Sequence, residues 1–160
     1  MQMDDLRRKF MQVAIDLARE GMNLGVGGPF GCVIVKDGAI VATGMNAVTS
    51  RKDPTAHAEI VAIRQACAQL EDHQLTGCDL YTSCEPCPMC LGAIYWARID
   101  RVYYACSRED AAAAGFDDHF IYNELQCGIG ERTISMVAME RATAVKVFEE
   151  WSQKEDKLRY

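Results

Sequence analysis

Apolar and polar positions along the chain follow two kinds of pattern: recurrence at helical spacing, which predicts helices, and short apolar runs bounded by turn residues, which predict strands. Apolar residues recur at helical spacing from Leu6 to Leu17, so we expect a first amphipathic helix that ends near Gly21. Two short apolar runs, 30–35 and 39–43, flank an Asp-Gly pair, which is a strong signal for a tight turn between antiparallel strands. The beginning of the chain is therefore predicted to be a helix followed by a β-hairpin.

The pattern then alternates between helix and strand. We expect a helix that Asp53 caps and Pro54 enters, running to about residue 69, because proline is tolerated in a first turn. The expected elements that follow are a strand at 79–82, a helix at 88–97, a strand at 102–106, a last strand at 134–139 and a closing helix at 143–157. Strand, helix, strand in succession predicts a parallel crossover. The sequence thus indicates one α/β domain over 1–160, with a mixed sheet covered by helices on both faces.

Composition and net charge limit the classes of function and partner that the chain can have. The chain has 160 residues, of which 49% are hydrophobic and 25% charged, as in ordinary globular domains. No apolar run approaches the roughly 20 residues that span a bilayer, and the acidic start is unlike a signal peptide, so we expect a cytoplasmic protein without a membrane partner. The net charge is −6 and no basic cluster is present, which favours a small-molecule partner over a nucleic acid.

Eight cysteines in a reducing compartment indicate metal binding or core packing rather than disulfides. Five of them are scattered along the chain, and small buried thiols pack as hydrophobic residues, so we expect core packing for Cys32, Cys67, Cys78, Cys106 and Cys127. The other three, Cys84, Cys87 and Cys90, are clustered and therefore point to a metal.

Two short stretches carry the chemistry, His57-Ala58-Glu59 and Pro86-Cys87-Pro88-Met89-Cys90. Each is expected in the first turn of a helix, where Cys87 and Cys90 project to one side and the helix dipole favours thiolates. Two sulfurs and the His57 imidazole select zinc and leave a fourth position for water, whose proton Glu59 would carry. This spacing is the signature of zinc-dependent nucleobase deaminases.

Other metal sites are possible on the same residues. Cys84 could join His57, Cys87 and Cys90 in a closed structural zinc site, and the repeated cysteine spacing also suits an iron–sulfur cluster. Neither alternative gives a reason for Glu59, so we expect Cys84 to end a strand beside the site. A non-catalytic zinc-binding interaction domain would likewise have no need of Glu59.

Several segments resemble the bacterial guanine deaminases of the cytidine-deaminase-like superfamily. The resemblance lies in 27–31, 53–59, 81–97, the Phe-Asp-Asp segment within 114–122, and the terminal Tyr160. It implies a three-layer α/β/α cytidine-deaminase-like fold with a central mixed sheet. It also implies one zinc ion per subunit and hydrolysis of guanine to xanthine and ammonia in purine catabolism or salvage.

The resemblance also implies roles for individual residues. Phe30 would line the base pocket, Asn46 would hydrogen-bond the purine, and Asp118 would meet the 2-amino group as a second proton carrier. A homodimer is implied, in which the C-terminal segment, about 140–160, crosses to the partner. Tyr160 and Trp96 would then serve the neighbouring subunit's site. No role is assigned to His119, and His73 is expected at the surface.

Two related enzymes share the metal motifs. A tRNA adenosine deaminase would have to bind an RNA loop. The net charge of −6 and a C-terminal tail without a basic helix argue against that activity. A cytosine deaminase is a further alternative, but the Phe-Asp-Asp segment is not expected there. Guanine remains the preferred substrate.

Overall fold

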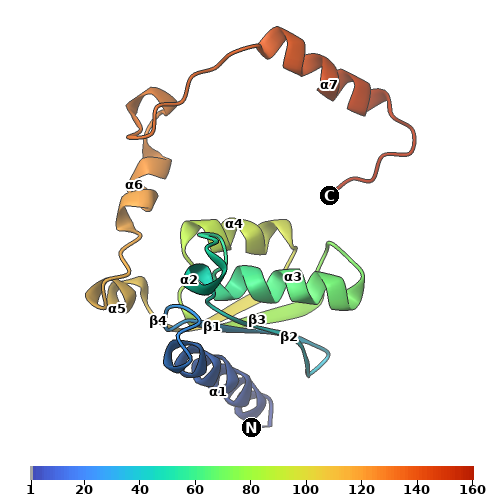
Figure 1. Cartoon of the computed structure of the whole chain (residues 1–160). Helices are drawn as coiled ribbons and strands as arrows, with labels where there is room; N and C mark the ends of the chain where they lie inside the picture. The colour runs from blue at the N-terminus through green and yellow to red at the C-terminus, as the bar shows by residue number, and fades with distance from the viewer. Residues whose placement is uncertain (1) are drawn as a thin grey trace. The chain divides into compact units, whose positions relative to one another are not determined.

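The computed structural model describes residues 2–160 and divides the chain into two compact units. The first unit ends at Asp118, and the second is His119–Tyr160. Elements of the first unit are α1 Gln2–Asn23, β1 Gly31–Lys36, β2 Ala39–Met45, α2 Val48–Arg51, α3 Ala58–Leu70, β3 Cys78–Cys84, α4 Pro88–Trp96, β4 Arg101–Cys106 and α5 Arg108–Ala113 (Figure 1). No helix in the described part of the chain is long and apolar enough to cross a bilayer.

The first unit is built on a mixed four-stranded sheet in the order β2-β1-β3-β4. β1 pairs antiparallel with both β2 and β3, whereas β3 and β4 are parallel and joined through α4. Asp37 and Gly38 both have positive φ, as a two-residue hairpin turn requires. The predicted hairpin and parallel crossover are therefore confirmed.

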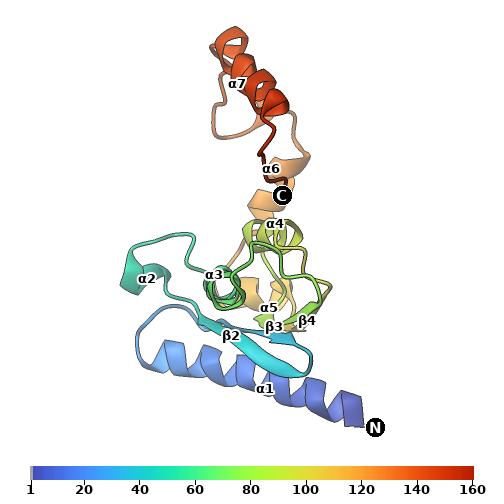
Figure 2. The ribbon, with the colours of Figure 1, turned by 90° about the vertical axis from the view of Figure 1, so that its right-hand side faces the viewer.

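Alternating residues of β1 pack on the two faces of the sheet. Cys32 and Ile34 are buried with the small residues of α3, whereas Val33 and Val35 are buried with Phe10 of α1. Helix α1 covers one face, and α3 and α4 cover the other (Figure 2). This arrangement confirms the predicted α/β/α layers, and it brings the first turns of α3 and α4 to the same side of the sheet.

The predicted start of the second long helix at Asp53 is wrong. Asp53 Oδ1 accepts hydrogen bonds from the backbone N–H of Thr55 at 2.8 Å and from its hydroxyl at 2.7 Å. This local turn competes with helical hydrogen bonding, so the helix begins four residues later than expected: α3 starts at Ala58 rather than Pro54, and its N-cap residue is His57 rather than Asp53. The consequence is that His57 has an extended backbone and precedes the helix, while Glu59 lies in its first turn.

The second unit consists of α6 His119–Gln126, a 3-10 turn at Ile129–Glu131 and α7 Arg141–Gln153. The helix predicted at 143–157 is present, but it starts and ends earlier. The strand predicted at 134–139 is wrong, because this segment is irregular in the structure. The apolar side chains of Ile134, Val137 and Met139 are exposed. A strand needs a neighbouring strand to pair with, and no strand occurs in residues 119–160.

Candidate metal centre and active site

Three side chains converge where α3 and α4 begin. His57 is the N-cap residue of α3, Cys87 is the N-cap residue of α4, and Cys90 lies one turn further along α4. His57 Nδ1 is 3.6 Å from both sulfur atoms, and the three potential ligand atoms lie within 4.8 Å of one another. A tetrahedral zinc ion with ordinary bond lengths to nitrogen and sulfur would hold such atoms about 3.6 Å apart. The donor set and its spacing therefore fit zinc.

The thiols of Cys87 and Cys90 interact through a shared hydrogen bond. A hydrogen bond from Cys90 and then one from His57 lower the pKa of Cys87 to about 4, against the opposing effect of burial. The pKa of Cys90 is raised because it shares that hydrogen bond and is buried. Pro88 occupies the first turn of α4, as predicted, and the N–H groups of that turn favour negative charge. A bound metal ion would take the place of the shared proton, and Cys87 and Cys90 would both hold it as thiolates.

Glu59 is buried beside this group, with 6% of its surface exposed. One carboxylate oxygen, Oε1, accepts a hydrogen bond of 3.1 Å from the Thr82 hydroxyl, and Oε2 lies 3.5 Å from Cys90 Sγ. Burial raises the pKa of Glu59 above its usual range. A carboxyl group with a raised pKa and a fixed position is suited to accept a proton and return it.

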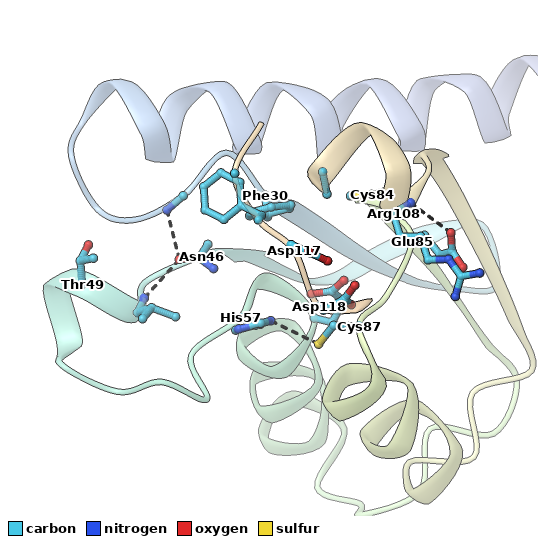
Figure 3. Close-up of a pocket in the computed structure, with 16 residues that line it drawn as sticks. Phe30, Asn46, Thr49, His57, Cys84, Glu85, Cys87, Arg108, Asp117 and Asp118 are labelled. Atoms are coloured by element: carbon cyan, nitrogen blue, oxygen red, sulfur yellow. Dashed lines mark hydrogen bonds between the residues drawn. The ribbon is translucent and has the colours of Figure 1, made fainter. Parts of the chain in front are cut away.

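A cavity of about 390 Å³ opens onto the metal ligands (Figure 3). Six of the site residues predicted from the sequence line it: Phe30, Asn46, His57, Glu59, Cys87 and Asp118. Cys90 is wholly buried behind them. The cavity is large enough for a small heterocyclic ligand and has both apolar and ionisable walls.

Asn46 has a fixed orientation in the wall of this cavity. Its Oδ1 accepts the backbone N–H groups of Gly28 at 3.2 Å and of Val48 at 3.3 Å, and the residue is 7% exposed (Figure 3). Because both bonds come from N–H donors, the atom that accepts them must be the amide oxygen. The Asn46 NH₂ group is left as the donor that a ligand can meet.

Asp118 lies in the cavity wall near Cys87, as Figure 3 shows. Burial, and then the negative charge of Cys87, raise the pKa of Asp118. The preceding Phe116 packs edge-to-face on Phe30, with ring centroids 4.9 Å apart. Phe116 was part of the matched segment but received no role from the sequence, because only the fold brings it to Phe30.

Sequence reasoning also missed two polar residues of the cavity wall, Glu85 and Arg108. Glu85 Oε2 accepts the backbone N–H of Arg108 at 3.2 Å, which ties the start of α5 to the segment before α4. Glu85 was part of the matched segment but received no role, and no local signal connects it with Arg108, which is 23 positions away.

Cys84 is the last residue of β3 and lines the cavity, but it does not belong to the group that could hold a metal ion. Its thiol donates to the Ser107 carbonyl oxygen at 3.4 Å, and burial raises its pKa to about 11. A neutral thiol hydrogen-bonded elsewhere argues against the closed four-ligand site.

The two remaining predicted residues are not in the cavity wall of the first unit. Trp96 ends α4 and is 64% exposed. Tyr160 belongs to the second unit and is 73% exposed. Their roles at a neighbouring subunit stay predictions.

Comparison with known proteins identifies relatives. The family model for the cytidine and deoxycytidylate deaminase zinc-binding region matches residues 4–106. Guanine deaminase of Bacillus subtilis is 56% identical over 151 residues, or 94% of this chain and 97% of that protein. An X-ray structure of guanine deaminase from B. subtilis matches with a TM-score of 0.93 at 55% identity, covering 96% of this chain and 98% of that one. A tRNA-specific adenosine deaminase of Haemophilus influenzae is 34% identical over 151 residues, covering 94% of this chain and 87% of that protein.

Proposed function

From the premise that this chain belongs to the cytidine and deoxycytidylate deaminase zinc-binding family, we propose that it hydrolyses guanine to xanthine and ammonia. The observation that carries this proposal is the likeness to a guanine deaminase, at 56% identity over nearly the whole of both chains. Over a stretch of the same length, identity to a tRNA-specific adenosine deaminase is 34%.

Zinc would be held by His57, Cys87 and Cys90, whose atoms have the spacing of a tetrahedral site. When bound, the ion supplies a Lewis acid and lowers the pKa of a water at its open position to about 7. Three protein ligands, rather than four, are typical of catalytic zinc, and the hydrogen bond of Cys84 to Ser107 is consistent with that number.

Glu59 moves protons between water and substrate. Its carboxylate accepts a proton as water adds to C2 of the purine, and delivers it to N3, which draws electron density from C2. A second transfer carries the remaining hydroxyl proton from C2 to the amine, so that the C2–N bond breaks, ammonia leaves and the C2 carbonyl of xanthine forms. The position of Glu59 beside Cys90, and its raised pKa, support this role.

Three side chains of the cavity would select guanine. The Asn46 NH₂ group donates to an acceptor atom of the purine, because its oxygen is already occupied by backbone N–H groups. Asp118 accepts from the 2-amino group and assists its departure, while Phe30 packs against the ring. A buried hydrogen-bonding site rejects a ligand without the matching groups far better than an apolar pocket does.

The protein would act as a homodimer in which the segment of about 140–160 crosses to the partner, while 1–160 remains one deaminase domain. Trp96 and Tyr160 would then complete the partner's site. Support comes from α7, which carries exposed Val147, Phe148 and Trp151. Contiguous exposed apolar patches mark protein–protein interaction sites, and a face of α7 formed by these side chains would suit one. The free thiols suit a reducing cytoplasm.

A direct test incubates purified, zinc-loaded protein with guanine, adenine, cytosine, cytidine and guanosine. Ammonia release and xanthine formation are measured beside an anticodon-loop RNA assay. We expect turnover of guanine and none of the RNA. Inosine in the RNA without turnover of guanine would instead identify a tRNA adenosine deaminase, and release from cytosine alone a cytosine deaminase.

A further inference from the structure

We infer that Thr82 is a positioning residue for the reaction, because it holds the Glu59 carboxylate in the orientation that proton transfer requires. This inference rests on the proposed function, in which Glu59 carries the protons. Thr82 belongs to neither metal-binding stretch and is wholly buried in the sheet, with 1% of its surface exposed.

The position of Thr82 in β3 directs its side chain toward α3. Leu80, two residues earlier, packs in the core cluster formed with α3, and side chains two apart in a strand share a face. Thr82 lies opposite Cys32 of β1, which belongs to that same cluster. The hydroxyl therefore lies in apolar surroundings beneath the first turn of α3, where Glu59 is located.

The hydrogen bond has a defined direction. An ionised carboxylate can only accept hydrogen bonds, so the Thr82 hydroxyl is the donor of the 3.1 Å hydrogen bond to Glu59 Oε1. The second oxygen, Oε2, is left beside Cys90 at 3.5 Å, on the side of the metal ligands. One oxygen is thus held by the sheet, and the other lies beside a residue of the candidate metal site.

Thr82 does not line the cavity, whereas Glu59 does. Loss of the hydroxyl should therefore affect the chemical step and leave substrate binding nearly intact. Loss of a hydrogen bond to a charged group is costly in free energy, and a small displacement of a catalytic group lowers the rate strongly. We expect Thr82→Val to lower kcat by about 10- to 100-fold, with KM changed by less than about threefold.

The experiment compares three zinc-loaded variants with the wild type on guanine. Thr82→Val has nearly the same shape without the hydroxyl, and Thr82→Ser keeps the hydroxyl without the methyl group. Thr43→Val is the matched control, since Thr43 is half-buried in β2 of the same sheet and lies opposite Val33, away from the cavity. We expect Thr82→Ser to approach the wild-type kcat, Thr43→Val to equal it, and all variants to keep their zinc.

A crystal structure of zinc-loaded Thr82→Val supplies a readout that does not depend on activity. It should show the Glu59 carboxylate rotated or in more than one position. The inference is overturned if Thr82→Val keeps kcat within a factor of about two of the wild type, loses its zinc, or leaves Glu59 in place. It is also overturned if Thr82→Ser is as impaired as Thr82→Val, since packing would then explain both. A folded, zinc-loaded wild type that does not turn over guanine contradicts the proposed function instead, and the position of Glu59 still tests Thr82.

Discussion

Glu59 Oε2 lies 3.5 Å from Cys90 Sγ, yet Glu59 is not one of the three residues whose atoms could hold a metal ion. A carboxylate that adjoins a metal ligand without being one can change protonation while the metal site stays intact. Metal binding and proton transfer should therefore be separable by mutation at this position.

Glu59→Gln should retain zinc and lose turnover, because the amide keeps the size of the side chain but cannot accept the proton. General acid–base groups contribute about 10²- to 10⁴-fold to rates, and we expect a fall in kcat of that order. Zinc content and guanine turnover are measured beside Glu20→Gln, an exposed control on α1. Loss of zinc from Glu59→Gln would make the residue a ligand, and unchanged turnover would remove it from proton transfer.

Removal of metal should abolish activity, and removal of a ligand should abolish metal binding. We expect Cys87→Ala to bind little zinc and Cys84→Ala to bind a full equivalent, because the Cys84 thiol is hydrogen-bonded to Ser107. Metal content of both variants is measured after dialysis against a chelator and reloading. If Cys84→Ala failed to rebind zinc, the interpretation as a closed four-ligand site would be correct instead.

The metal site was predictable because its signals are local. Cys87 and Cys90 are three residues apart, and Pro88 between them favours a helix start. These local features place both side chains on one side of the helix, independently of the rest of the fold. His57 was predicted as a ligand although its helix was expected to start too early, at Asp53. The Asp53 carboxylate can accept hydrogen bonds either in a local turn with Thr55 or as a helix cap, so the sequence pattern alone could not decide between them.

Individual contacts between side chains of distant segments were not predicted. The contact of Thr82 with Glu59 joins residues 23 positions apart in different elements, and the packing of Phe116 on Phe30 spans a still longer stretch. The largely apolar segment 134–139 was expected to form a strand, but such a segment forms one only where a neighbouring strand is available to pair with.

Asp118 can be tested by two substitutions that separate its possible roles. Asp118→Ala removes both the acceptor and the proton carrier, whereas Asp118→Asn keeps an acceptor oxygen. We expect Asp118→Ala to lower guanine turnover by about 100-fold or more with zinc retained. A similar loss in Asp118→Asn would indicate proton transfer, and a smaller one would indicate orientation of the amine. Asp16→Ala on α1 is the exposed control, and wild-type kinetics in both Asp118 variants would remove Asp118 from the mechanism.

Gly44 of β2 permits the close approach of α3 to the sheet. A Cβ atom there would lie 2.1 Å from the Ala58 carbonyl oxygen, at the start of the helix that follows His57. Gly44→Ala should lower the free energy of unfolding by on the order of 1–3 kcal/mol, as overpacked cores do. The control is Gly92→Ala in α4, where no heavy atom lies within 4 Å, and where alanine should stabilise the helix. Urea denaturation of the zinc-loaded proteins measures both, and a fully stable Gly44→Ala would show that the helix can shift at little cost.

The crossing of the C-terminal segment can be tested by mixing two inactive proteins. One carries Glu59→Gln, and the other lacks residues 157–160. If Tyr160 completes the partner's site, a mixed dimer has one site with an intact Glu59 and an intact tail from the partner. Unfolding and refolding the two together should then restore up to about a quarter of the wild-type activity, since half of the dimers are mixed and each has one working site. If the tail serves its own subunit, every mixed dimer has two defective sites and mixing restores nothing. Full activity of the truncated protein alone would rule out any role for Tyr160.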